Sequence, residues 1–229
     1  MTRGIFLAGN ESALSRAIEA ETVNRVEQFA AAFIPNRLSA GNFVGGSGAS
    51  KNVPAENEKR LSLDWNPSSP ISARTVVIAA ENRLEHIDEA ILICSPPSIR
   101  SSAADLPFSD VEIMLNDHIK GWFFLVKELA AIFRNRGRGT LALIFQDIAS
   151  SGKDDAADIL GPSALASFRA LTVGLLAAAH NDQYLTAGFS VSDAGNDAAF
   201  AAFMYKTIDE LTKRSSGKLF KFGKFNFFK

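Results

Sequence analysis

The feature that most constrains the fold of this chain is a regular alternation of short apolar runs with longer helical patterns. Runs of about five residues that are apolar throughout are typical of strands buried on both faces of a sheet. The sequence predicts strands at Gly4 to Ala8, Phe29 to Ile34, Leu61 to Trp65, Ala90 to Cys94, Thr140 to Phe145, Tyr184 to Phe189 and Lys218 to Phe222.

Helical patterns fill most of the segments between these runs. They cover Ser12 to about Val26, Pro70 to about Leu84, Asp110 to Arg134, Pro162 to Ala179, and Asp197 to Arg214. The segment from Asn36 to Asn57 is rich in Gly, Ser and Asn, and it is expected to be a long flexible surface loop. Strands that alternate with helices predict an α/β fold, with one doubly wound, mostly parallel sheet in a single domain over residues 1–229.

Composition narrows the class of protein. The 229 residues carry 24 Lys and Arg against 25 Asp and Glu, a net charge of −1, which argues against a protein that wraps nucleic acid. The single cysteine, Cys94, excludes an intramolecular disulfide and fits a reducing cytoplasm. Lys127 and Glu128 interrupt the most apolar run, so no transmembrane helix is expected.

Several stretches in this order resemble the short-chain dehydrogenase/reductase family. They are Leu61 to Trp65 before a helix, His118 to Phe123 within one, Arg138 to Ile144 entering a strand, and Ser167 to Thr172. The resemblance covers nearly the whole chain, together with the strand, glycine turn and helix at its N-terminus. It implies a Rossmann-type three-layer αβα sandwich that binds NAD(P).

The family's glycine motif provides three small positions for the turn and the cofactor pyrophosphate. The matching residues are Gly9, Ala13 and Ser15, and Asn10 follows the first of them. Ala13 adds a methyl group where the phosphates approach, so anion binding is expected to be weakened but not abolished. The alternative interpretation is that Gly9 only ends a strand.

The other cofactor positions also depart from the family. Phe33 falls where a carboxylate would bind the ribose, and Arg37 is the one candidate for an NADP phosphate. Asp64 resembles the acidic residue beside the adenine, but an Asp before a helix is also a common cap or turn residue. Pro96 and Pro97 replace residues that support the cofactor and remove two backbone donors. We therefore expect weak NAD(P) binding or none.

The family's catalytic Tyr-x-x-x-Lys pair has no counterpart here. Alignment through Ser167 to Thr172 puts Gly161 at the Tyr position and Leu165 at the Lys position, and neither side chain transfers a proton. The Ser position falls among Gln146 to Ile148, with Ser150 and Ser151 as the nearest hydroxyls. The sequence thus predicts a degenerate active site and a pseudoenzyme.

His118 occupies the family's Asn position. An imidazole facing the retained pocket would serve as a general acid or base supported by Asp147 or Ser150, whereas the commoner role of such a histidine is a hydrogen bond to solvent or backbone. Cys94 is expected to be a small buried hydrophobic residue. No spacing of His, Asp and Glu indicates a metal site.

Two features favour assembly into a homodimer or homotetramer, or a hetero-oligomer with an active family member. The helices Asp110 to Arg134 and Pro162 to Ala179 are apolar beyond the stripe that a sheet covers, and the corresponding helices pair across a two-fold axis in the family. The tail at 213–229 interleaves Lys and Phe, and subunit contact is expected for it. A membrane-surface anchor and a nucleic-acid arm are the alternatives for that tail.

Overall fold

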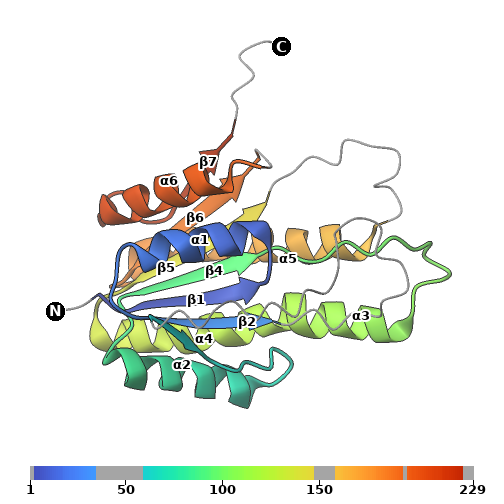
Figure 1. The fold of residues 1–229 in the computed structure, drawn as a ribbon, viewed down its shortest axis with the longest axis horizontal. Coiled ribbons are helices and arrows are strands. Elements are labelled where there is room, and N and C mark those ends of the chain that lie inside the picture. Colours follow the sequence, from blue (N-terminus) through green and yellow to red (C-terminus); the bar gives the residue numbers. More distant parts are fainter. Residues whose placement is uncertain (1–2, 35–58, 147–157, 193–194, 224–229) are drawn as a thin grey trace, which may run out of the picture.

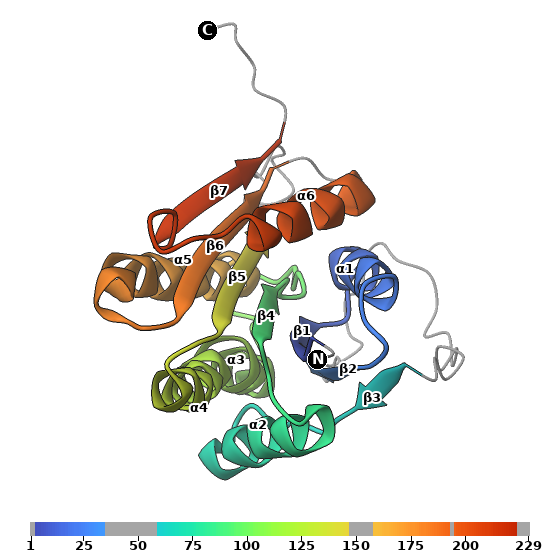
Figure 2. The same ribbon diagram turned by 90° about the vertical axis from the view of Figure 1, so that its left-hand side faces the viewer.

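A single parallel sheet organises the chain. The computed structural model describes residues 3–34, 59–146, 158–192 and 195–223. Its seven strands lie in the order β3-β2-β1-β4-β5-β6-β7, and every neighbouring pair is parallel (Figures 1 and 2). The strands are β1 (Ile5–Asn10), β2 (Phe29–Ile34), β3 (Arg60–Ser62), β4 (Glu89–Cys94), β5 (Thr140–Gln146), β6 (Leu185–Val191) and β7 (Lys218–Phe222). The predicted doubly wound α/β fold is confirmed.

Helices cover both faces of the sheet. They are α1 (Ala13–Val23), α2 (Pro70–Leu84), α3 (Phe108–Leu115), the π-helical turn η2 (Asn116–Lys120), α4 (Gly121–Arg136), α5 (Leu160–Ala178), the 3-10 turn η4 (Ala179–Asn181) and α6 (Asp197–Asp209). Helices α1 and α6 pack together on one face, and α2, α3, α4 and α5 cover the other (Figure 2). The three layers form the αβα sandwich that the sequence predicts.

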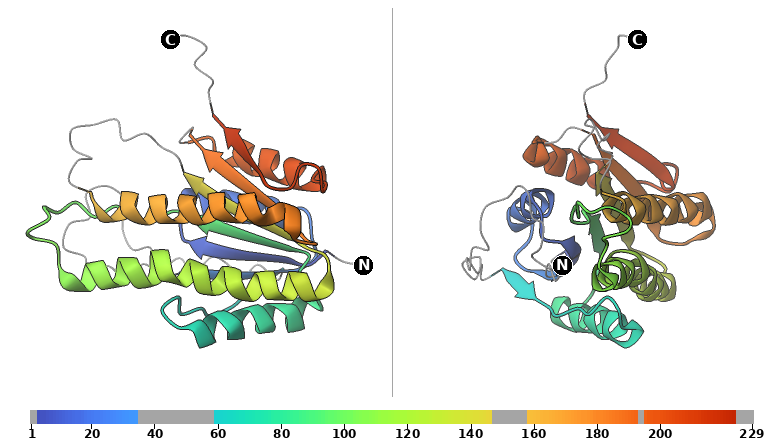
Figure 3. Two further views of the ribbon diagram at one scale, coloured as in Figure 1. Left: turned by 180° about the vertical axis from the view of Figure 1, so that it is seen from behind. Right: turned by 90° about the vertical axis from the view of Figure 1, so that its right-hand side faces the viewer.

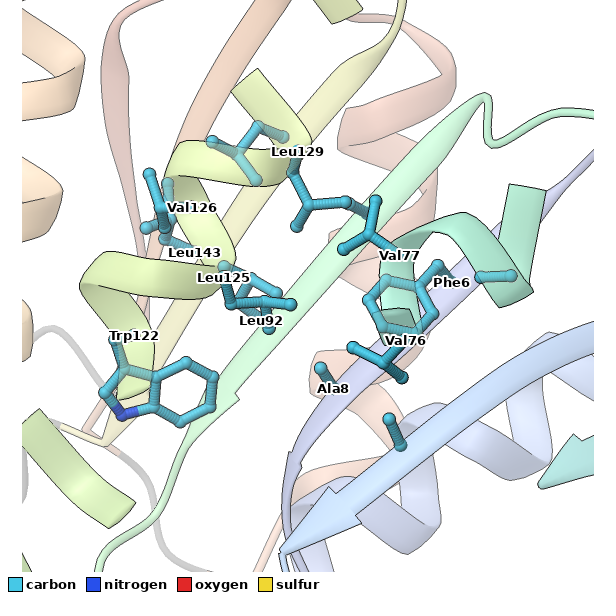
Figure 4. Close-up of a cluster of buried hydrophobic side chains, with 14 of the residues drawn as sticks. Phe6, Ala8, Val76, Val77, Leu92, Trp122, Leu125, Val126, Leu129 and Leu143 are labelled. Atoms are coloured by element: carbon cyan, nitrogen blue, oxygen red, sulfur yellow. The ribbon is translucent and has the colours of Figure 1, made fainter. Parts of the chain in front are cut away.

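Alternate residues of each central strand supply the two cores. Phe6 and Ala8 of β1 point toward α2 and α4, where they pack with Leu92 and Trp122 (Figure 4). Ile5 and Leu7 point to the opposite face and pack under α1 and α6. Because both faces of β1 are covered, the strand is apolar from Ile5 to Ala8 instead of alternating.

Local signals set several helix ends where the sequence indicates them. Ser69 caps α2 by accepting a hydrogen bond from the backbone N–H of Ser72 at 3.2 Å, and Pro70 follows in the first turn, where no intrahelical partner is needed for its nitrogen. Gly137 ends α4 with φ of 68°, a left-handed conformation that favours glycine.

Several predicted elements differ in extent. β1 continues through Gly9 to Asn10 because parallel partners flank it on both sides. β3 pairs over three residues only, since β2 is its single neighbour and it lies at the sheet edge. The helix predicted at Asp110 to Arg134 begins earlier and contains the turn η2. α6 ends at Asp209, five residues before the predicted Arg214.

One expectation about membranes needs correction. The segment Leu160–Asn181, which combines α5 and η4, is 22 residues long and apolar enough to span a membrane by length and composition. Its buried residues form one stripe that includes Ala164, Phe168 and Leu176 and faces the sheet. We interpret α5 as a covering helix of the sandwich with an apolar outer surface.

The C-terminal tail is only partly described, and its described part is a strand. Phe220 stacks on Phe189 with ring centroids 5.5 Å apart, and Phe222 contacts Phe200 and Phe203 at 5.7 Å and 5.4 Å. These two phenylalanines of the tail are therefore half-buried against β6 and α6, at one edge of the sheet. The predicted loop at 36–57 and residues 224–229 of the tail lie outside the described residues.

Candidate functional site

A cavity of about 240 Å³ opens at the carboxyl edge of the sheet, where β1, β2 and β4 end. In open parallel sheets this edge is where ligands bind. The described lining residues are Asn10, Glu11, Ser12, Ile34, Ser95, Pro96, Pro97 and His118. Three of them, Asn10, Ile34 and His118, are buried, with 5%, 2% and 4% of their surface exposed.

The side chain of Asn10 connects His118 on one side of this cavity with Ser95 on the other. Its side-chain Nδ2 lies 3.0 Å from His118 Nδ1, and its Oδ1 accepts from the backbone N–H of Ser95 at 3.4 Å. Because the amide oxygen faces a donor, the nitrogen must face His118, and His118 Nδ1 is then the acceptor. Nδ1 is therefore the unprotonated ring nitrogen in this arrangement.

Two consecutive polar residues of the π-helical turn η2 lie inside the protein. Asp117 and His118 are consecutive, yet only 2% and 4% of their surfaces are exposed. A π-turn inserts one extra residue into a helix, and such turns are frequent at functional sites. On either side of η2, the buried residues Met114 and Trp122 still face the interior.

The first turn of α1 uses its own side chains to satisfy its backbone donors. Ser15 N donates to Ser12 Oγ at 3.0 Å, and Ser12 N donates to Ser15 Oγ at 2.8 Å, which is a capping box. Ser15, a candidate cofactor residue, is thus a buried structural residue, while Ala13 is exposed. The Glu11 side chain stands before this turn and lines the cavity.

Gly9 has a packing role in the sheet. A Cβ atom at this position would lie 2.6 Å from the carbonyl oxygen of Ile93 and 2.9 Å from its Cβ. A larger residue would therefore push β1 and β4 apart. Gly9 is the penultimate residue of β1, so this packing role is in line with the alternative interpretation, in which the glycine serves the strand.

Asp64 is exposed and follows β3. It does not cap α2, because Ser69 does, so the cap interpretation is wrong. Its neighbour Trp65 is buried and lies 5.5 Å from the ring of Trp122. Asp64 does not line the cavity described above.

Gly161 lies in the first turn of α5 against the loop that follows β4. A Cβ atom there would be 2.8 Å from Asp158 Oδ2 and 3.1 Å from the carbonyl oxygen of Pro97. Gly161 N donates to Asp158 Oδ1 at 3.0 Å, and Asp158 forms an isolated antiparallel bridge with Arg100. The loop after β4 is thus connected at Arg100 to the residues just before α5.

Leu165 is one turn further along α5 and packs against the core beneath α4. Its side chain therefore belongs to the packing of the helix on the sheet. Asp147 and Ser150, the residues expected to support His118, lie outside the described residues. Of the residues expected at the site, the structure brings Asn10 and His118 into contact.

Two further predictions concern the role of Cys94 and the presence of a metal site. Cys94 is fully buried, and burial raises the pKa of its thiol, as expected for a small hydrophobic residue. Among the described residues, no group of three or more His, Cys, Asp and Glu side chains is arranged to hold a metal ion.

Sequence reasoning did not find Glu11, Ser95 or Asp117. Asp117 lies three residues after Met114 and shares its buried helix face, but a carboxylate is not expected in the interior, so its residue type did not single it out. Ser95 contributes a backbone N–H, which no side-chain motif reports. Glu11 precedes a cap residue, where acidic residues are common for reasons of helix stability.

The sequence matches no protein-family model and no curated protein sequence. Solved structures nevertheless match over almost the whole chain. The acetoin dehydrogenase YohF from Salmonella typhimurium is 12% identical, with a TM-score of 0.71 over 96% of this chain and 94% of that one. A short-chain dehydrogenase from Mycobacterium smegmatis is 9% identical, with a TM-score of 0.71 over 98% and 93%.

ElxO, solved with NADP bound, is 12% identical with a TM-score of 0.71 over 96% of this chain and 97% of that one. The fold is that of the short-chain dehydrogenases. At such low sequence identity, the structural similarity establishes the fold alone. The chemistry of the site has to be argued from the residues of this chain.

Proposed function

We propose that this protein is a non-catalytic subunit with a short-chain dehydrogenase fold, which binds a small molecule or a partner and does not reduce carbonyl groups. The observation that carries the proposal is the packing around Gly161, where Asp158 and the carbonyl of Pro97 lie within 3.1 Å of the point that a Cβ atom would occupy. Gly161 supplies no phenol, and a side chain at this position would have to displace the Asp158 carboxylate and press on the carbonyl of Pro97. Leu165 supplies no cation to lower a phenol pKa.

The test is an activity assay with the purified full chain. We expect no oxidation of NADH or NADPH above background across a broad panel of aldehydes and ketones. Turnover at rates ordinary for dehydrogenases would overturn the proposal. As a positive control, a catalytically competent short-chain dehydrogenase is assayed in parallel, which shows that the aldehydes and ketones of the panel can be reduced.

A second candidate function is an enzyme with altered chemistry. It is favoured by His118, which lines the cavity and is oriented by Asn10 instead of facing solvent. A neutral imidazole is suited to general acid or base catalysis near neutral pH. If a substrate is found, loss of turnover in His118→Gln with retained binding would favour this candidate over a binding subunit.

We also propose that NAD(P) binds weakly or not at all. The capping box between Ser12 and Ser15 occupies two backbone donors that a pyrophosphate would use. The Glu11 carboxylate adds negative charge beside them. Calorimetric titration is expected to give no binding of NADH or NADPH at low-micromolar affinity, and such an affinity would contradict this view.

Finally, we propose that the protein assembles through the outer surfaces of α4 and α5, with itself or with an active relative. These helices lie side by side on one face of the molecule (Figure 3). Phe123 and Val173 on them are 49% and 53% exposed. Exposed apolar side chains on adjacent helices are typical of subunit contacts.

A further inference from the structure

We propose that the cavity at the carboxyl edge of the sheet binds a small apolar amine, and that Glu11 selects its positive charge. The inference rests on the proposed function in that it takes this cavity to be the binding site. It adds the chemical class of ligand. Three features of the cavity support this ligand class. They are the charge of its lining, the occupied hydrogen-bond donors and the apolar walls.

The charged group among the described lining residues of the cavity is a carboxylate, so the lining carries a negative charge. Glu11 is the one carboxylate among the described lining residues, and no Lys or Arg is among them. His118 is uncharged in this arrangement because its Nδ1 accepts from Asn10. Glu11 makes no ion pair within the described residues, so its carboxylate is available to an ammonium group.

Two of the backbone donors that could hold a phosphate are already occupied. Of the N–H groups in the first turn of α1, that of Ser15 is bonded to Ser12, and that of Ser12 is bonded to Ser15. The amide of Asn10 is shared between Ser95 and His118. A phosphate entering here would lose its water and meet Glu11, which is unfavourable for an anion.

The remaining walls are apolar and the space is small. Ile34 closes one side at the end of β2, and the rings of Pro96 and Pro97 form part of another. A cavity of about 240 Å³ is below the range of about 300–1,000 Å³ that is usual for drug-sized ligands. A ligand with a compact apolar body and one ammonium group matches this lining.

The experiment compares three probes that share one skeleton and differ in charge, namely benzylamine, benzyl alcohol and benzoate. Each is titrated into the full ¹⁵N-labelled chain, and the side-chain amide signal of Asn10 and the backbone signals of Glu11 and Ser12 are followed. We expect benzylamine to bind most tightly, with a Kd of about 1 mM for so small a probe. Benzyl alcohol should follow, and benzoate should be weakest.

The variant Glu11→Gln tests the selecting residue. It should weaken benzylamine by about tenfold, the size of a lost hydrogen bond between charged groups, and leave benzyl alcohol unchanged. Glu210→Gln, at an exposed carboxylate beyond the end of α6, is the matched control and should change neither probe.

Three outcomes would overturn the inference. They are equal or tighter binding of benzoate, retention of the amine preference in Glu11→Gln, and no shift of the three reporter signals with any probe. None of these bears on carbonyl reduction, which is measured by turnover. Failure of the ligand assignment is therefore distinguishable from failure of the proposed function.

Discussion

Asn10 determines how the ring of His118 carries its proton. The hydrogen bond from Asn10 Nδ2 requires a bare Nδ1, so ¹⁵N spectra of the labelled imidazole should show Nδ1 unprotonated and Nε2 protonated at neutral pH. Asn10→Ala removes this partner from both His118 Nδ1 and Ser95 N. We expect it to cost about 1–3 kcal/mol of unfolding free energy in urea.

Asn10→Asp provides the contrasting result. A carboxylate accepts hydrogen bonds and cannot donate to Nδ1, so His118 should then carry a proton on Nδ1. A wild-type spectrum with a protonated Nδ1 would contradict the assignment of the amide orientation.

At single positions the sequence identifies the location of the site better than the roles of its residues. Gly9 and Ser15 are placed by the family pattern beside a cofactor, and both lie near the carboxyl edge as expected. Their contacts, however, are with Ile93 and with the backbone of Ser12. Spacing along the chain indicates which residues are neighbours, but it does not distinguish a glycine needed for strand packing from one needed for a phosphate.

Among the elements, the start of α5 carries a prediction about restoring chemistry. The double variant Gly161→Tyr with Leu165→Lys recreates the residue types of the family pair. We expect no carbonyl reduction, because a side chain at position 161 would displace the Asp158 carboxylate and press on the carbonyl of Pro97 in the loop after β4. Overpacking should also destabilise the fold by about 1–3 kcal/mol. Ser163→Tyr, at an exposed position of the same helix, is the control for adding a phenol to α5.

Measurable turnover with NADPH in the double variant, and not in the control, would show that the loop after β4 moves aside. That result would also weaken the argument for a non-catalytic subunit.

The contact between α6 and the start of β1 predicts a dependence of stability on pH. Burial raises the pKa of Asp209, but hydrogen bonds from Arg25 and Arg3 outweigh it and hold that pKa below its usual value. The Asp209 carboxylate therefore adds stability above the unfolded-state pKa, and this is lost as the pH falls through the folded-state value.

Asp209→Asn should lower the urea midpoint near pH 7, and the difference from wild type should shrink as the pH falls toward about 2. Asp64→Asn, at an exposed site with no described hydrogen bond, should show no such pH-dependent difference. A difference that stays constant with pH would contradict the role of the charge.

Element types follow closely from the sequence, and element interruptions do not. The helix predicted at Asp110 to Arg134 is present, but η2 divides it. The buried residues before, within and after η2 keep one helical period, so the sequence gives no sign of the π-turn. The short extent of β3 is equally invisible, because it depends on the single strand that pairs with it.

For the whole molecule, the central question is whether the chain assembles. Phe124 of α4 and Leu175 of α5 are half-buried, whereas Phe123 and Val173 on the same helices are about half exposed. Phe123→Glu or Val173→Glu should therefore split a dimer or tetramer without disturbing the core. Light scattering at tens of micromolar measures this, with Ile71→Glu on α2 as the control at an exposed residue elsewhere.

A monomeric wild-type protein that co-purifies with no relative would rule out the assembly proposal. The apolar outer surface of α5 would then require another explanation, such as contact with a membrane.

The strand order also has a consequence for how the protein is made. β1, the first strand to leave the ribosome, lies between β2 and β4. β2 and β3 then extend the sheet in one direction, and β4, β5, β6 and β7 extend it in the other, each pairing with an edge that already exists. No strand has to enter between two partners that have already paired, so the sheet is able to grow in the order of synthesis. The last strand to arrive, β7, covers the open edge of β6 with Phe220 and Phe222, and until it does so a nascent chain exposes that edge to other nascent chains.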